Sequence, residues 1–431
     1  MNDTDTIPLP LEYGATPSSV SNRIPLDQQL AEFKEFGNPT VVQSATFESP
    51  TGGNAEVRVF VNEYWTARQR QAHSLHEISY RACFKPQLPR FFIERLTAPG
   101  EIVYDPFMGR GTTPIEAALL GRVPYGCDIN PLSLVFAGAR LRPPQSAAVE
   151  ARLREVDFSD PGEMPEDLLV FYHPYTLREV SALRKFLMNR RASGRSDDVD
   201  NWITAVAINR LTGHSAGFFS VYTLPPNQAT SVKAQQRINE RRNQVPPRRD
   251  VKSIVLKKSR QLLGDCDPRT RITLGSVTNR ARLLNGPAAA TPEILDGSVS
   301  LVVTSPPFLS VVNYAGDNWL RCWFLGVDAK SIQLTNTSRL PVWQEAMTAV
   351  FRELRRVLKP GGRVAFEVGE VSAGAVKLEL AVLPCGVEAG LRPELVLVNA
   401  QKFTKTANCW GVDNNEKGTN SNRVVVFEKS A

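Results

Sequence analysis

A glycine-rich stretch at residues 105–113, Asp-Pro-Phe-Met-Gly-Arg-Gly-Thr-Thr, follows a short apolar run and precedes a helical pattern. Gly109 and Gly111 would let a ligand approach the backbone and would leave the first amides of the next helix free to bind it. The spacing differs from the Gly-x-Gly-x-x-Gly of a dinucleotide-binding turn. A plain tight turn has the same composition, so this stretch alone does not identify a ligand.

Asp128 ends the next apolar run, 23 residues after Asp105. A carboxylate at the end of a second parallel strand can accept hydrogen bonds from both ribose hydroxyls of an adenosyl ligand. The structural alternative is a helix N-cap or turn aspartate. Because a glycine-rich turn precedes Asp128, we favour the ligand-binding role.

A third candidate is the sequence Thr-Ser-Pro-Pro-Phe at residues 304–308, which ends another apolar run. Two prolines cost hydrogen bonds of the sheet and fix the backbone, so they suit a rigid loop. Such a loop can present the Ser305 hydroxyl, the Pro306 carbonyl and the Phe308 ring to a planar substrate. A loop that merely ends a strand is the alternative for this tetrapeptide taken by itself.

The hydrophobic periodicity predicts an α/β fold whose elements place these motifs at strand ends. A strand, a glycine turn, a helix and a second strand in residues 101–130 predict a right-handed βαβ unit and a mostly parallel, Rossmann-like sheet. We expect further strands at 55–62, 298–308, 363–369 and 422–429, and helices at 88–96, 112–121, 177–190, 202–211 and 343–358.

The chain of 431 residues is long enough for a large domain with an insertion. We expect an irregular N-terminal arm at 1–50, a cofactor-binding half at 51–144, an inserted, largely helical region at 145–274 and a catalytic half at 275–431. The insertion contains a run of basic residues between 233 and 260 that only Glu240 and Asp250 oppose. A solvated helical face is the alternative to a role of this run in binding.

The composition gives a formal charge of +7, which is compatible with a polyanionic partner without establishing one. The six cysteines are scattered without a Cys-x-x-Cys pair, so neither a disulfide framework nor a zinc site is expected. No metal ligand set is evident among the histidines, and His73 and His76 are predicted at a helix surface or beside DNA. The N-terminus lacks the pattern of a signal peptide and no apolar run could span a membrane, so we expect a cytoplasmic protein.

Taken together, DPFMGRGTT (105–113), GCDINP (126–131) and TSPPF (304–308) resemble the motifs of the amino-group DNA methyltransferases, which methylate N4 of cytosine or N6 of adenine. The resemblance covers roughly residues 80–140 and 275–430. It includes FKPQLPRFFIERL (84–96) beside the cofactor and LLNG (283–286) near the adenine. The family often has an acid where this chain has Asn285.

The resemblance implies S-adenosylmethionine as the cofactor and gives it a set of binding residues: Asp105, Phe107, Gly109, Gly111, Thr112, Asp128, Asn130 and Asn285. It implies that the target base binds to Ser305, Pro306, Pro307 and Phe308 after it has been flipped out of double-stranded DNA. Serine at the first position of the tetrapeptide favours cytosine N4 over adenine N6. A Cys-dependent C5-methyltransferase is not indicated, because Pro384-Cys385 lies on the wrong element.

In the family, an insertion between the two motifs carries target recognition, which implies that residues 145–270 bind DNA. Phosphate contacts are expected from Lys233, Arg237, Arg241, Arg242, Arg248 and Arg249. Base contacts are expected from 173–175, Phe218, Phe219, Tyr222, Asn227 and Gln228. Two alternatives stay open: an RNA or tRNA amino-methyltransferase, and a DNA-binding protein that has lost catalysis.

Overall fold

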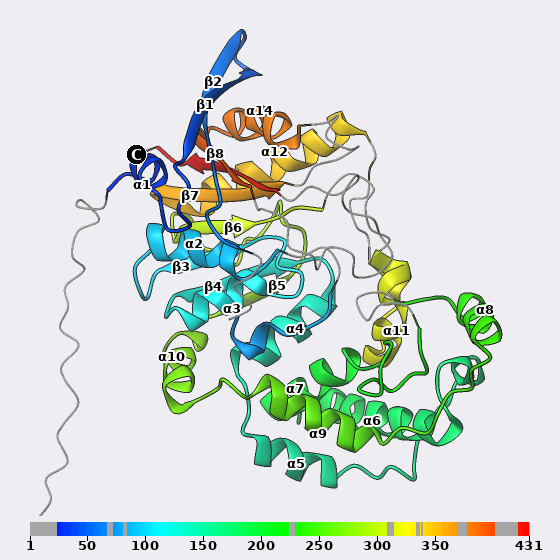
Figure 1. Ribbon diagram of the computed structural model, residues 1–431. Coiled ribbons are helices and arrows are strands. Elements are labelled where there is room, and N and C mark those ends of the chain that lie inside the picture. The colour runs from blue at the N-terminus through cyan, green and yellow to red at the C-terminus, as the bar shows by residue number, and fades with distance from the viewer. Residues whose placement is uncertain are drawn as a thin grey trace, which may run out of the picture.

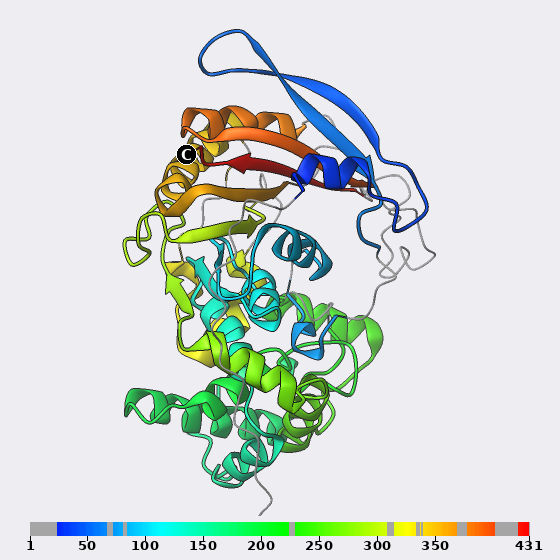
Figure 2. The ribbon, with the colours of Figure 1, turned by 90° about the vertical axis from the view of Figure 1, so that its left-hand side faces the viewer.

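The computed structural model describes residues 24–66, 72–80, 84–223, 229–307, 314–332, 337, 339–368, 377–400 and 421–430. Its centre is a sheet that has nine strands among these residues, in the order β1-β2-β8-β9-β7-β6-β3-β4-β5. A lobe of helices lies at one side of this sheet (Figures 1 and 2). The motif residues belong to the sheet, and the basic run belongs to the helical lobe.

Five neighbouring strands are parallel and carry the Rossmann-like order 3-2-1-4-5 when they are numbered along the chain. They are β5 (Arg282–Asn285), β4 (Val123–Asp128), β3 (Ile102–Asp105), β6 (Val299–Thr304) and β7 (Leu358–Val368). Antiparallel β9 (Ser421–Glu428) lies between β7 and β8 (Arg392–Ala400). The predicted α/β fold with a mostly parallel, Rossmann-like sheet is confirmed.

Helices cover both faces because alternate residues of the buried strands point to opposite sides. Val103 packs with Leu301 and with Phe92 of α2 (Gln87–Leu96), whereas Tyr104 joins the core of the other face. The other helices around the sheet are α3 (Thr112–Leu119), α4 (Pro131–Leu141), α10 (Pro268–Thr278), α12 (Leu340–Val357), α13 (Leu378–Ala381) and α14 (Leu383–Glu388). The predicted helices at 88–96, 112–121 and 343–358 are therefore present.

The N-terminal segment that we expected to be irregular contains a helix and a strand. Helix α1 (Leu26–Ala31) buries Leu26 and Leu30, and β1 (Val41–Glu48) pairs with β2 (Asn54–Asn62) in a long antiparallel hairpin (Figure 1). Strand β2 then pairs in parallel with β8. The prediction failed for β1 because six of its eight residues are exposed, so its sequence lacks a clear alternation of apolar and polar residues.

The inserted region forms the helical lobe: α5 (Ser146–Arg154), α6 (Pro174–Ala192), α7 (Asp198–Ile208), α8 (Val232–Arg242) and α9 (Val251–Leu262). Helix α11 (Tyr314–Leu325) follows β6 in the chain but packs on this lobe. Arg184 Nε donates to the Trp323 carbonyl at 2.9 Å, and Trp319 Nε1 donates to the Thr230 carbonyl at 3.1 Å. Three short 3-10 turns complete the set: Ser74–His76, Glu166–Val170 and Ala329–Ser331.

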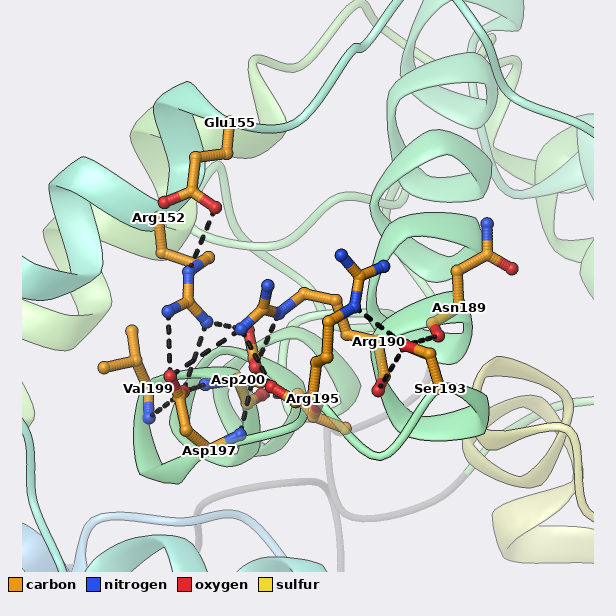
Figure 3. Close-up of polar contacts among 10 residues, drawn as sticks. Arg152, Glu155, Asn189, Arg190, Ser193, Arg195, Asp197, Val199 and Asp200 are labelled. Carbon is orange, nitrogen blue, oxygen red and sulfur yellow. Dashed lines mark hydrogen bonds and ion pairs between the residues drawn. The ribbon is translucent and has the colours of Figure 1, made fainter.

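An ion-pair network fixes three of the inserted helices against one another (Figure 3). The buried carboxylate of Asp200 accepts from Arg190 Nε at 2.7 Å and also from Arg152. Asp197 caps α7 and accepts from Arg152 Nη2 at 2.8 Å. These contacts join α5, α6 and α7, so ion pairs as well as an apolar core hold the lobe together.

Candidate functional site

The carboxyl ends of β3 and β6 meet, because these two strands are parallel neighbours. Asp105, the last residue of β3, is 1% exposed and accepts from the Thr304 hydroxyl at 2.6 Å and from the Phe107 amide at 3.0 Å. Burial raises the pKa of Asp105 to about 7, and these hydrogen bonds oppose the rise. A direct bond therefore connects the glycine-rich loop to the residue before Ser305.

The loop after Asp105 depends on glycine at two positions. Gly109 has φ +49° and Gly111, the N-cap residue of α3, has φ +82°. A Cβ on Gly111 would lie 2.7 Å from Cβ of Ala137, so a larger residue would be strained and would also collide. Thr112 follows as the first, buried residue of α3. Glycine at position 111 is thus required both by its backbone conformation and by the close approach of α4.

Asp128, at the end of β4, holds this loop with one oxygen and the start of α4 with the other. Its Oδ2 accepts from the Gly109 amide and its Oδ1 accepts from the Asn130 amide, both at 2.8 Å. Burial raises the pKa of Asp128, and the two backbone hydrogen bonds oppose that rise. Asn130 caps α4 and donates to the Tyr80 hydroxyl at 3.2 Å. Asn285 Nδ2 donates to the Asp128 carbonyl at 2.8 Å.

The Ser-Pro-Pro loop leaves β6 beside the glycine-rich loop. Pro306 is buried, and the Pro307 carbonyl accepts from Trp343 Nε1 of α12 at 3.0 Å. This bond anchors the loop to a long helix of the sheet layer. Phe308, the predicted stacking residue, lies outside the described residues.

The sequence analysis missed one carboxyl group at this loop, that of Glu367 on β7. Its neighbour Phe366 pairs with Thr304, which brings Glu367 next to Ser305. Burial raises the pKa of Glu367, and hydrogen bonds from the Ser305 and Asn422 side chains oppose the rise. A single acid inside the apolar run RVAFEVG (363–369) was the signal that could have identified it, because a buried strand rarely carries an unpartnered charge.

Comparisons with known proteins agree with these motifs. Residues 33–134 match a family model for N6/N4 methyltransferases, described as DNA methylase. The Type II methyltransferase M.MjaII of Methanocaldococcus jannaschii is 36% identical over 75 residues, which are 17% of this chain and 14% of that protein. M.BsoBI of Geobacillus stearothermophilus is 23% identical over 316 residues, covering 66% of this chain and 59% of that one.

Over part of its length the chain is therefore similar to DNA methylases of the N4/N6 family. It spans less than two thirds of the length of each relative named here. Among solved structures, TrmN of Thermus thermophilus is 15% identical with a TM-score of 0.31, over 81% of this chain and 50% of that one. The rRNA methyltransferase AviRa of Streptomyces viridochromogenes is 12% identical with a TM-score of 0.33, over 83% of this chain and 90% of that one.

The residues predicted to contact phosphates lie together on the helical lobe. They are Lys233, Arg237, Arg241, Arg242, Arg248 and Arg249, of which only Arg249 is not exposed. No described residue places a carboxylate within 4.0 Å of any of these six cations. Two exposed tyrosines stand beside them: Arg242 lies 3.8 Å from the Tyr222 ring and Arg248 lies 4.8 Å from the Tyr175 ring.

Two expectations for this lobe and its surroundings were wrong. Phe218 and Phe219 are 6% and 0% exposed, so they belong to the core and cannot reach a base. His76 is also buried, and its Nε2 lies 2.7 Å from Glu116 Oε2. Both errors arose because a local pattern does not show what packs on it. Asn227 and Gln228 lie outside the described residues.

Three further predictions concerned metal sites, membrane-spanning segments and the role of Cys385. The described ranges contain no group of three or more His, Cys, Asp or Glu that could hold a metal ion. They also contain no helix of the length and apolarity that crossing a bilayer requires. Cys385 is buried on α14, with its thiol 3.6 Å from the Ala381 carbonyl.

Proposed function

We propose that this chain transfers the methyl group of S-adenosylmethionine to the exocyclic amino group of a base in double-stranded DNA, with N4 of cytosine as the favoured target. The observation that carries the proposal is the hydrogen bond between Asp105 and Thr304. It joins the ends of two parallel strands, so a ligand on the glycine-rich loop and a base on the Ser-Pro-Pro loop would be neighbours. The motifs and the partial similarity to N4/N6 DNA methylases supply the chemistry.

The glycine-rich loop fits a methyl donor with an adenosyl group. Positive φ angles at Gly109 and Gly111 give the loop a turn that other residues adopt only with strain. The Asp128 carboxylate is held at the next strand end, where oxygens can accept from ribose hydroxyls. The full proposed set is Asp105, Phe107, Gly109, Gly111, Thr112, Asp128, Asn130 and Asn285. When bound, S-adenosylmethionine supplies a methyl group activated by a sulfonium.

The Ser-Pro-Pro loop would bind the flipped base, at a cost of about a few kcal/mol for flipping. Stacking on Phe308 would return roughly 1–3 kcal/mol of that cost. The Pro306 carbonyl and the Ser305 hydroxyl would accept hydrogen bonds from the amino group. Such bonds draw the amine toward tetrahedral geometry and free its lone pair from conjugation with the ring.

Glu367 orients the Ser305 hydroxyl in this scheme. A hydroxyl that donates to the Glu367 carboxylate presents its lone pairs to other donors, and the amino group of the base is such a donor. Positioning of the two bound reactants would supply most of the rate enhancement. Pro307, anchored by Trp343, would hold the loop in this conformation.

Double-stranded DNA would dock on the cations of the helical lobe. Exposed arginines without carboxylate partners retain their charge for phosphates, and each phosphate contact makes binding more sensitive to salt. Family members of the Type II class suggest a role in a restriction-modification system.

The decisive experiment is mass spectrometry of nucleosides from DNA incubated with the protein and S-adenosylmethionine. We expect N4-methylcytosine, and N6-methyladenine instead would move the target to adenine. Ser305→Ala should lower transfer by at least about 100-fold with little change in cofactor binding, and Ser276→Ala on α10 is the matched control. Absence of any methylated base together with absence of cofactor binding would refute the proposal in favour of a catalytically inactive DNA-binding protein. Methylation of tRNA alone would redirect it to RNA.

A further inference from the structure

Residues 72–80 form a bridge between the glycine-rich loop and the helical lobe. This bridge segment contains the 3-10 turn Ser74–His76 and is irregular on both sides of it. Its residues form hydrogen bonds or ion pairs with two neighbouring parts of the molecule. The cofactor-binding half is contacted by Leu75, His76, Ile78 and Tyr80. The helical lobe is contacted by His73, Ser74, Glu77 and Ser79.

Two arginines bind the bridge segment to the glycine-rich loop through backbone carbonyls. Arg140 of α4 is 1% exposed and donates to the Leu75 carbonyl at 2.9 Å, and it also donates to the carbonyl of Arg110, between the two glycines. Arg110 itself donates to the Ile78 carbonyl at 2.9 Å. Because glycines restrict the backbone so little, the conformation of this loop depends on such external contacts.

The opposite side of the bridge segment is bonded to α7, α9 and the turn after α9. The Ser74 amide donates to Asp265 Oδ2 at 2.7 Å, and the Ser74 hydroxyl donates to the Leu262 carbonyl at 2.8 Å. Glu77 pairs with the buried amine of Lys258 at 2.8 Å and accepts from Gln261. The lobe therefore forms hydrogen bonds and an ion pair with residues of the segment that do not contact the glycine-rich loop.

We infer that Ser74, Glu77 and Asp265 are positioning residues for the methyl donor, and that the helical lobe sets the glycine-rich loop through the bridge segment. The inference rests on the proposed function, because it takes that loop as the donor site. A displacement of the segment would lengthen the bonds that Arg140 and Arg110 make to its carbonyls. Hydrogen bonds from charged groups such as guanidinium are among the stronger ones. Small displacements of the bridge segment would therefore change the conformation of the glycine-rich loop.

The test is calorimetric binding of S-adenosylhomocysteine to the full chain and to Glu77→Ala, Asp265→Ala and the double variant. We expect Kd to rise roughly three- to tenfold in each single variant and further in the double variant, although neither residue lies at the loop. Steady-state kinetics should show a higher KM for S-adenosylmethionine with kcat nearly unchanged at saturation. Asp160→Asn, which breaks the exposed pair with Lys185 in the same lobe, is the control and should leave Kd unchanged.

Arg140→Lys gives an independent arm, because lysine retains the charge but cannot reach several carbonyls at once. Its Kd should rise more than that of either lobe variant, while urea unfolding reports whether the fold is intact. Unchanged Kd in folded Glu77→Ala and Asp265→Ala, with normal binding by the wild type, would overturn the inference alone. Failure of the wild type to bind would instead count against the proposed function.

Discussion

The helical lobe uses arginine in two opposite ways. Arg152 and Arg190 surround the buried Asp200 and lie within a closed network with Asp197 (Figure 3). A second group of cations has no described carboxylate within 4.0 Å and is mostly exposed: Lys233, Arg237, Arg241, Arg242, Arg248 and Arg249. The first group joins helices to one another, whereas the second forms no such ion pairs among the described residues and is the group that we propose for phosphate contacts. Basic composition alone therefore does not distinguish the two groups, whereas ion pairing with nearby carboxylates does.

The comparison extends to the sheet. The loops after β3 and β4 resemble the closed network, since Asp105 and Asp128 both accept hydrogen bonds from neighbouring backbone or side chains. We therefore expect substitutions in the Asp200 network and in these two loops to lower the free energy of unfolding. Substitutions on α8 should weaken DNA binding only.

The largest effect should come from Asp200→Ala. Removing this buried carboxylate leaves the two partly buried guanidinium groups with only the more exposed Asp197 as a shared partner, and breaking a buried pair typically costs about 3–5 kcal/mol. Urea unfolding of the two proteins measures the loss. Asp160→Asn removes an exposed pair with Lys185 and should cost less than about 1 kcal/mol. Equal losses of unfolding free energy in the two variants would contradict the expected difference between the buried ion-pair network and an exposed ion pair.

Asp105 should make the protein less stable as the pH rises. Its pKa is raised from 3.8 to about 7 on folding, so between these values the folded protein binds a proton that the unfolded chain has released. Stability then falls with rising pH, by at most about 1.4 kcal/mol for each unit of the shift. Asp105→Asn should lose less stability than the wild type between about pH 4 and pH 7. Parallel curves of unfolding free energy against pH would show that the site does not titrate in this way.

Two glycines with the same φ of +82° separate strain from collision. Gly100→Ala adds a Cβ with no atom within 4 Å, so only the backbone cost of about 1–2 kcal/mol applies. Gly111→Ala adds the collision with Ala137, for which overpacking typically costs a further 1–3 kcal/mol. Thermal unfolding and S-adenosylhomocysteine binding should both be affected more by Gly111→Ala. Similar values for the two variants would mean that α4 moves away readily.

The smallest effect on stability should come from the exposed arginines of α8 that have no described carboxylate partner. Arg237→Ala, Arg241→Ala and Arg242→Ala should each change the unfolding free energy by less than about 0.5 kcal/mol. Each should weaken DNA binding for all sequences alike and lower the slope of log affinity against log salt by about 1. Fluorescence anisotropy over a salt series measures both quantities. An unchanged slope in the triple variant would remove α8 from the DNA-binding surface.

Much of the fold could be predicted because its signals are local. The pattern of residues 101–130 contains a strand, a glycine turn, a helix and a strand, and the structure has β3, α3 and β4 there. Hydrophobic periodicity and glycine placement are set by neighbours in the chain. Strand β1 escaped prediction because it lies at an exposed edge, where no alternating pattern is required.

The sequence by itself determined the motifs at strand ends, the parallel sheet and the basic run of the insertion. Only the tertiary structure decided that Thr304 bonds to Asp105, that Glu367 lies beside Ser305 and that His76 is buried against Glu116. These partners are distant in the chain, and strand order with helix packing brings them together. Local propensity carries no information about such contacts, because they form only when the chain closes on itself.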